Sequence, residues 1–414
     1  MTGPLSALRV VEVASFVAGP LACLSLAQLG AEVIRIDPIG GAADQYRWPI
    51  ASTGRSLYWA GLNKEKRSVE LNLRSPEGRE LAVALATAPG PDGGIVVTNA
   101  VGGEWIGYDA LAARRSDVIH ARLTGRPDGA PAVDYTVNAG LGFPLVTGAE
   151  RAPVNHLLPA WDLLAGMTLA LSVVVAERNR RITGQGEAIE VSLWDVALAS
   201  TSHLGYLAEA ETLPESRGRY GNYYYGGFGR DFETRDGRVM VVVLSHRQWL
   251  KLVEATGLGS QVEAYSEQVG ADFAQDSDRF LHRERLAAMV EPWFAALTVA
   301  EAVDELENAG IVCSPYRTFQ ELAVLRGPLV ADNPLLEVIE EEGIGSVHAA
   351  RTPITWRNHP LKSVRSSHSL GADTEEVLSE LLGLSVGEIG ALADRGVVSL
   401  QPPDTSGTAQ AVGA

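Results

Sequence analysis

The feature that most constrains the fold is a strand, a helix and a second strand within the first 36 residues. Leu8–Val13 (LRVVEV) and Ala31–Ile36 (AEVIRI) are short, largely apolar runs of the kind that form buried strands. Between them, Ala18-Gly19-Pro20 predicts a turn, and Leu21–Leu29 predicts an apolar helix that Gly30 ends. Two strands joined by a helix indicate a parallel sheet.

Three further strands are predicted before residue 125. They lie at Arg67–Leu73, Gly93–Thr98 and Val118–Leu123. A helix begins at Ser75-Pro76-Glu77, because serine is a favoured cap and proline suits the first turn. The predicted fold class is therefore α/β, with the first 125 residues forming a doubly wound domain around a parallel sheet.

The rest of the chain is more helical. Asp162–Arg181 is the strongest predicted helix, and Thr183-Gly184 ends it. Strands are predicted at Ala188–Leu193 and Arg238–Leu244, and a late helix at Asp373–Leu382. Residues 245–330 are mostly helical, which suggests a smaller second domain.

The composition favours an ordinary globular protein of the cytoplasm. The formal net charge is −17 and the pI is near 5.0, so the protein's field repels a nucleic-acid backbone. The two cysteines, Cys23 and Cys313, are too few for a disulfide framework, which fits a reducing compartment. The N-terminus lacks the pattern of a signal peptide, and the apolar run Leu163–Ala176 is too short to cross a bilayer. We therefore predict a cytoplasmic protein that binds neither nucleic acid nor membrane.

Several chemistries lack their sequence signatures. The eight histidines are scattered, and neither HExxH nor CxxC occurs, so no metal site is predicted. GxSxG and GxxxxGK[ST] are also absent, which argues against the common serine hydrolases and the P-loop enzymes. No GxGxxG follows the first strand, so a nicotinamide or flavin cofactor lacks its fingerprint.

Asp162 lies in the segment Pro159–Asp162, where the long helix is predicted to begin. Aspartate is a favoured N-cap, so position alone favours a structural role in satisfying the first amides of the helix. The functional interpretation uses the same location, because a helix N-terminus stabilises an anion and would keep a nucleophilic carboxylate ionised. The residue pattern leaves both interpretations open.

A basic cluster, Asn63–Ser68 (NKEKRS), precedes one of the predicted strands. It brings Lys64, Lys66 and Arg67 together, and such clusters are commonly solvated turns. In a protein that is otherwise negative, it could also contact a phosphate group.

A run rich in glycine and tyrosine, Gly218–Gly229 (GRYGNYYYGGFG), is predicted to form no regular element. Two interpretations have equal weight. The run is either a linker between domains or a mobile loop whose bare backbone, at Gly226, Gly227 and Gly229, closes over a reactive intermediate.

Four ordered segments resemble those of the family III CoA-transferases, a family that includes formyl-CoA transferase and carnitine CoA-transferase. The segments are LRVVEVASFVAGPLACLSLAQLGAEVIRID, LNKEKRSVELNL, TGQGEAIEVSLWDVAL and SLGADTEEVL. The similarity covers nearly the whole chain, and four ordered motifs are more specific than any one of them.

The resemblance implies a Rossmann-like large domain, a smaller α+β domain, and two subunits threaded through each other as an interlocked homodimer. It implies that the C-terminal segment returns to the large domain. The predicted domains are residues 1–220 completed by 331–400, a small domain of residues 221–330, and a disordered tail of residues 401–414. The family's catalytic aspartate falls on Asp162, and its glycine-rich loop falls on Gly226 and Gly227.

Branches of the family differ at a few positions. In 2-methylacyl-CoA racemases a His-Asp pair supplies a base; here the pair falls on Val133-Asp134, and valine cannot transfer a proton. The glutamine that precedes the first turn of formyl-CoA transferase is replaced by Val17. The segments DYTVN, VNHLLPAWD and GNYYYGGFGRDFET resemble a branch that moves CoA between the two carboxyl groups of mesaconate. Transfer to a second acid, racemisation, and a CoA-binding protein without catalysis stay open as alternatives.

The resemblance also implies the ligands. The substrate is the acyl-CoA thioester of a small dicarboxylic acid, with CoA as part of the substrate and no tightly bound cofactor or metal. Contacts to CoA are expected from Phe16, Asn63, Lys66, Arg67 and Asn99. The free carboxylate needs a cationic partner, for which the candidates are Arg47, His156 and Arg230.

Overall fold

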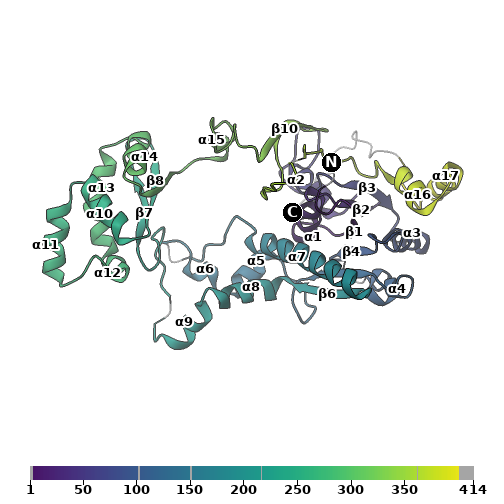
Figure 1. Cartoon of the computed structure of the whole chain (residues 1–414), viewed down its shortest axis with the longest axis horizontal. Coiled ribbons are helices and arrows are strands. Elements are labelled where there is room, and N and C mark those ends of the chain that lie inside the picture. Colours follow the sequence, from purple (N-terminus) through teal and green to yellow (C-terminus); the bar gives the residue numbers. More distant parts are fainter. Residues whose placement is uncertain (1–2, 101–102, 150–151, 216, 361, 401–414) are drawn as a thin grey trace. The chain divides into compact units, whose positions relative to one another are not determined.

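The computed structural model describes residues 3–100, 103–149, 152–215, 217–360 and 362–400 (Figure 1). By their contacts, the described residues form two compact units. The first is drawn from Met1–Leu141, Leu157–Ala208 and Asp332–Ala414, and the second from Gly142–His156 and Glu209–Ala331. Whether these units are independent domains with the predicted limits stays a prediction, and the predicted tail lies outside the described residues.

A six-stranded parallel sheet forms the centre of the first unit (Figure 1). Its strands are β1 (Arg9–Val13), β2 (Glu32–Pro38), β3 (Arg67–Leu71), β4 (Ile95–Thr98), β5 (Ile119–Thr124) and β6 (Glu187–Ser192). Their order is β3-β2-β1-β4-β5-β6, with Val10 paired to Val33 on one side and to Ile95 on the other. This is the order of a doubly wound sheet, and the predicted α/β class with a parallel sheet is confirmed.

The central strands consist mainly of branched apolar residues because they are buried on both faces. On one face, Val11, Ile34 and Val69 pack in a single core with α3 (Pro76–Ala86), α16 (Thr374–Leu382) and α17 (Val386–Asp394). The helices predicted at Ser75 and Asp373 are thus present, whereas α17 was not predicted.

Helix α1 (Ala18–Gln28) begins earlier than the sequence predicts, because the supposed turn Ala18-Gly19-Pro20 is its first turn. Proline fits there, since the amides of the first turn have no partner inside the helix. Helix α1 packs closely against α7 (Ala160–Thr183), and a Cβ on Gly166 would lie 2.8 Å from the Ala18 carbonyl oxygen. Glycine at this position therefore allows the close approach of the two helices.

Helix α7 is longer than predicted and ends at Gly184, which has a left-handed conformation. Among the described residues, its 24 residues are long and apolar enough to cross a bilayer by length and composition, so the prediction that its apolar run is too short was wrong. Core helices pass the same test. Here α7 packs against α1, β5 and β6 of its own unit.

The remaining elements of the first unit are short. They are η1 (Ala43–Tyr46), α2 (Leu57–Leu62), η2 (Glu104–Ile106), α4 (Tyr108–Ala112), α5 (Asp134–Gly140), α8 (Leu193–His203) and the hairpin β10 (Leu336–Glu341) and β11 (Gly345–Ala350).

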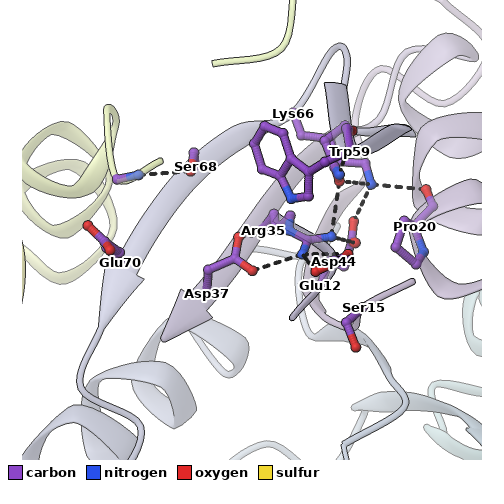
Figure 2. A network of polar contacts seen from close by, with 12 residues as sticks. Glu12, Ser15, Pro20, Arg35, Asp37, Asp44, Trp59, Lys66, Ser68 and Glu70 are labelled. Carbon is purple, nitrogen blue, oxygen red and sulfur yellow. Dashed lines mark hydrogen bonds and ion pairs between the residues drawn. The ribbon is translucent and has the colours of Figure 1, made fainter. Parts of the chain in front are cut away.

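A buried cluster of charges lies beside β1 and β2 (Figure 2). Arg35 of β2 forms ion pairs with Glu12, at 3.1 Å, with Asp37, at 2.7 Å, and with Asp44, at 3.3 Å. Lys66 pairs with the other oxygen of Glu12 at 2.7 Å. Because both cations and all three carboxylates are buried, each depends on its partners, and removing one would leave an uncompensated charge.

The C-terminal segment is tied to β3. The Asp373 carboxylate accepts a hydrogen bond from the Ser68 amide at 2.7 Å and also contacts the Nδ1 atom of His368, at 2.6 Å. Thr374 accepts from the Glu70 amide, and Val398 forms a β-bridge with Leu71. These contacts hold α16 and α17 against the sheet edge.

The second unit is built on an antiparallel sheet of β7 (Phe228–Glu233), β8 (Arg238–Val243) and β9 (Val312–Pro315). Its helices are α6 (Phe143–Val146), α10 (His246–Ala255), α11 (Gly259–Val269), α12 (Asp276–Leu281), α13 (Arg283–Ala295), α14 (Val299–Asn308) and α15 (Phe319–Ala323). Helix α9 (Tyr206–Thr212) contains the boundary between the units. The prediction that 218–229 holds no regular element fails at its end, where β7 begins.

We predict that the His368–Asp373 contact makes the stability of the first unit depend on pH. The hydrogen bond to Asp373 raises the pKa of His368 above its ordinary value of 6.5. Its stabilising contribution is therefore complete below about pH 6.5 and is lost as pH rises through the raised pKa. Although burial opposes it, hydrogen bonds from His368 and Ser68 lower the pKa of Asp373, whose own contribution is lost only in acid.

Urea unfolding of the wild-type protein and the His368→Gln variant between pH 5.5 and 8.5 measures this contribution. The wild-type advantage in midpoint should shrink as pH rises. A difference between the two proteins that is the same at every pH would contradict the prediction.

Candidate active site

A cavity of about 560 Å³ opens at the carboxyl ends of the parallel strands in the first unit. Val13 ends β1, Pro38 ends β2 and Thr124 ends β5, and all three line it. The strand order reverses between β1 and β4, which is where doubly wound sheets bind ligands. Its polar and aromatic lining residues include Ser15, Phe16, Asp37, Arg47, Asn99, Asp134, Tyr135 and Asp162.

Asp162 lines this cavity as the third residue of α7, so its interpretation as the N-cap was wrong. Pro159 takes the cap position and has no side chain that can accept a hydrogen bond. The carboxylate of Asp134, on α5, replaces it by accepting from the amides of Trp161, at 2.8 Å, and Asp162, at 3.2 Å. Capping by another helix therefore leaves the Asp162 carboxylate available to the cavity.

The environment of Asp162 raises its pKa from 3.8 to about 6. Burial is the main cause, the negative charge of Asp134 adds to it, and the positive charge of Arg47 opposes both. The sequence led us to expect a helix N-terminus that keeps this carboxylate ionised. With a pKa of about 6 it is about nine-tenths ionised at pH 7, and it is a stronger base than an ordinary aspartate.

Phe16 and Asn99, two of the residues predicted to contact CoA, lie in the cavity wall. Phe16 has a φ of 69°, a strained value for a residue with a side chain, and the residue is 46% exposed. Hydrogen bonds hold this strained turn on both sides. The Asn99 side chain accepts from the Ser15 amide and donates to the Ser15 carbonyl. Asp44 accepts from the Phe16 amide at 2.9 Å. A strained residue held in place and exposed to a cavity is typical of a functional site.

Arg47, predicted to bind the free carboxylate, also lines the cavity. Its guanidinium lies over the rings of Tyr58, at 4.4 Å, and Phe16, at 5.9 Å. Among the described residues it has no ion pair and no side-chain hydrogen bond. This charge is therefore available to an anion.

The other three residues predicted to contact CoA make contacts within the protein and do not line this cavity. Lys66 is buried, pairs with Glu12 and donates to the Pro20 carbonyl and to Asn63. Asn63 is buried too and also accepts from Arg35. Arg67 forms ion pairs with three glutamates, Glu32, Glu376 and Glu380. The lysine and arginine side chains of the basic cluster are engaged in ion pairs, and its predicted phosphate contact stays a prediction.

The remaining predicted residues lie in the second unit, and their roles stay predictions. Gly226 has a φ of 80°, and a Cβ at Gly227 would lie 2.8 Å from the Tyr224 ring, so both positions require glycine. Arg230 donates to the Asp231 carbonyl and to the Tyr223 hydroxyl and pairs with Glu291. His156 is the last residue of Gly142–His156, the first of the two chain segments that form the second unit.

Residue patterns missed the role of Asp134 as the cap of α7 and the packing of Tyr58 against Arg47. The DYTVN segment drew attention to Asp134 only as part of a racemase pair. Its partner Val133 is exposed and lines the cavity, where it offers no proton-transfer group. Within the described residues, no three His, Cys, Asp or Glu side chains cluster closely enough to hold a metal ion.

Comparisons with known proteins agree on one family. The model of CoA-transferase family III matches residues 5–374. The chain is 46% identical over 403 residues to 2-methylfumaryl-CoA isomerase of Chloroflexus aurantiacus, covering 96% of this chain and 98% of the relative. It is 26% identical to succinyl-CoA:mesaconate CoA-transferase of Haloarcula marismortui, over 89% of this chain and 92% of that protein. A CAIB/BAIF family protein from Brucella suis has a similar fold, with a TM-score of 0.77, 24% identity and coverage of 92% of this chain and all of that one.

We predict that the two neighbours of Asp162 shift its titration in opposite directions. Replacing Asp134 with Asn removes a negative charge but keeps an acceptor for the helix amides, so the pKa of Asp162 should fall below about 6. Replacing Arg47 with Gln should raise it further. Carbon-13 NMR of aspartate-labelled protein, assigned with an Asp162→Asn variant, measures both shifts. Shifts of the same sign in the two variants would contradict the assignment.

Proposed function

Because the chain belongs to CoA-transferase family III, we propose that it is an intramolecular CoA transferase that moves CoA between the two carboxyl groups of mesaconate, the reaction of a 2-methylfumaryl-CoA isomerase. The observation that carries the proposal is a partly buried carboxylate with a raised pKa, Asp162, beside an unpaired cation, Arg47, in the cavity of the first unit. The relative of 46% identity supports the choice of substrate.

Asp162 is the nucleophile in this proposal. One of its carboxylate oxygens attacks the thioester carbonyl carbon, the carbon–sulfur bond breaks, and CoA leaves as its thiolate. The product is a mixed anhydride between Asp162 and mesaconate. The thiolate then attacks the Asp162 carbonyl carbon, and the anhydride bond breaks to give an aspartyl-CoA thioester and free mesaconate.

The second half of the reaction reverses these steps with the other carboxylate. Mesaconate turns in the cavity, and its other carboxylate attacks the aspartyl thioester, which again releases the thiolate. The thiolate then attacks the mesaconyl carbonyl of the second anhydride and restores the Asp162 carboxylate. No reactant other than the thioester is consumed, and holding the diacid in place makes its second attack effectively unimolecular.

The start of α1 offers donors for the oxyanion of each step. Val17 and Ala18 line the cavity, and no side chain caps this helix. Amides at a helix N-terminus stabilise negative charge that develops beside them. Anhydrides also require protection from water, and the role of the loop at Gly226 and Gly227 stays a prediction.

Transfer of CoA to a second acid is the alternative, and one observation favours it. The relative of 26% identity is named a succinyl-CoA:mesaconate CoA-transferase, which moves CoA between two molecules. The chemistry at Asp162 is the same in both cases. The difference is whether the diacid leaves the cavity between the two halves of the reaction.

We also propose that the protein is a homodimer. Leu164, Met167, Leu171 and Val175 are exposed and follow one another on one face of α7. A long apolar stripe in contact with water is unfavourable, and a second copy of the chain would bury it.

Replacing Asp162 with Ala should lower turnover of mesaconyl-CoA by roughly a thousandfold or more, because the covalent route is lost. Hydroxylamine added during turnover should label Asp162 in the wild-type protein, as detected by peptide mass spectrometry. Asp195 is a matched control, since it is the third residue of α8, follows a tryptophan as Asp162 does, and is exposed. An active Asp162→Ala variant, or a label elsewhere, would refute the nucleophile.

Mesaconyl-CoA labelled with carbon-13 at the thioester carbonyl distinguishes the two modes of transfer. Intramolecular transfer should move CoA to the unlabelled carboxyl without any added acid, and unlabelled free mesaconate should not enter the product. Incorporation of the free acid at every turnover would show the intermolecular reaction instead.

The dimer is tested by replacing Leu171 with Asp. Sedimentation velocity should show a dimer for the wild-type protein and a lower mass for the variant, since a charge would be buried in the contact. Val386→Asp, at an exposed apolar residue that begins α17, should leave the mass unchanged. A wild-type protein that sediments as a monomer would overturn the proposal.

A further inference from the structure

A second cavity, of about 350 Å³, lies within the second unit, and the mechanism above does not use it. Residues 220–223 of the glycine-tyrosine run form part of its wall. Its charged lining residues are four arginines, Arg219, Arg230, Arg238 and Arg283, and two acids, Asp231 and Glu284. A cavity of this size suits a small molecule, and arginines gathered around it in a protein of net charge −17 indicate an anion.

Two of the four arginines make contacts that build the cavity wall. Arg238 pairs with the buried carboxylate of Asp231 at 2.6 Å. Arg219 donates to the Leu145 carbonyl at 2.7 Å, which ties the glycine-tyrosine run to the first chain segment of the unit. The other two arginines are therefore the candidates for binding a ligand.

Arg230 and Arg283 lie against one aromatic ring. Their guanidinium carbons are 5.0 and 5.6 Å from the centre of the Tyr223 ring. Arg230 pairs with Glu291 at 3.3 Å. Arg283 pairs with Glu284 at 3.7 Å. Because both glutamates are at least half exposed, these pairs contribute little, and two like charges beside the same ring still favour an anion.

Each of these two guanidinium groups keeps a donor for a ligand. The Nη1 atom of Arg230 donates to the Tyr223 hydroxyl, and that of Arg283 donates to the Phe280 carbonyl. Within the part of the chain that the structure describes, the Nη2 atom of each has no hydrogen-bond partner, and neither Nη2 atom is buried. The two side chains are 26% and 18% exposed. Both donors are therefore accessible in the cavity that the two residues line.

We propose that Arg230 and Arg283 form a site in the second unit that binds a ligand through its phosphate groups. A carboxylate is satisfied by the two prongs of one guanidinium, whereas a phosphate has further acceptor oxygens and binds two. The ring of Tyr223 holds both cations in place. The proposal assigns Arg230 a phosphate instead of the carboxylate expected from the sequence, and it does not rest on the proposed function.

Calorimetric titration of the full chain with inorganic pyrophosphate tests this site. Arg230→Gln and Arg283→Gln should each weaken binding by roughly tenfold, the loss expected for a hydrogen bond to a charged group. Arg235→Gln is the matched control, since Arg235 pairs with an exposed glutamate of the same unit and does not line the cavity. Its affinity for pyrophosphate should equal that of the wild-type protein. Thermal unfolding shows which variants are folded, and if Arg283→Gln is not, Arg230→Gln decides alone.

Competition with CoA identifies the source of the phosphate. Displacement of pyrophosphate by CoA would make the phosphates of CoA the ligand, and no displacement would assign a separate phosphate compound; both results support the site. A wild-type protein that does not bind pyrophosphate would overturn it, as would equal affinities in all four proteins. Displacement by mesaconate at the same concentration as phosphate would show a carboxylate site instead. CoA transfer is not measured in this experiment, so a failure of the proposed function leaves its outcome unchanged.

Discussion

The buried ion cluster around Arg35 is the interaction on which the cavity depends. Its guanidinium joins Glu12 of β1, Asp37 of β2 and Asp44 of η1, all of them removed from water. Such a cluster adds little net stability, but each member is held strictly by the others because a lone buried charge is very unfavourable. Asp44 of this cluster also accepts a hydrogen bond from the Phe16 amide. The buried ion pairs therefore help to fix the strained turn at Phe16 in the cavity wall.

The contact between Asp134 and the start of α7 leaves the Asp162 carboxylate free of the helix amides. A carboxylate that caps its own helix is satisfied by amides and is a poor nucleophile. Here the amides of Trp161 and Asp162 are satisfied by Asp134, which also repels the Asp162 carboxylate and so contributes to its raised pKa of about 6. One residue thus stabilises the helix start and makes its neighbour more basic.

The apolar strands and the fold class were predictable because buried parallel strands have a local signature. Less was predictable where a distant partner decides the outcome. Glu12, more than fifty positions earlier, holds Lys66 in the buried ion cluster, and the predicted contact of Lys66 with CoA stays a prediction. Asp162 looked like a cap because nothing in the local pattern shows that Asp134 occupies that role.

The distribution of charge decides what the proposed diacid substrate would meet in this cavity. Among the described residues that line it, Asp37, Asp134 and Asp162 carry carboxylates and Arg47 is the one cation. A second carboxylate on the substrate would therefore be repelled unless Arg47 met it. Lys66 is held in the Arg35 cluster by Glu12 and does not line the cavity, so among the described lining residues Arg47 alone offers a positive charge to the diacid. The raised pKa of Asp162 limits the repulsion further, because a fraction of its carboxyl groups is neutral when the diacid binds.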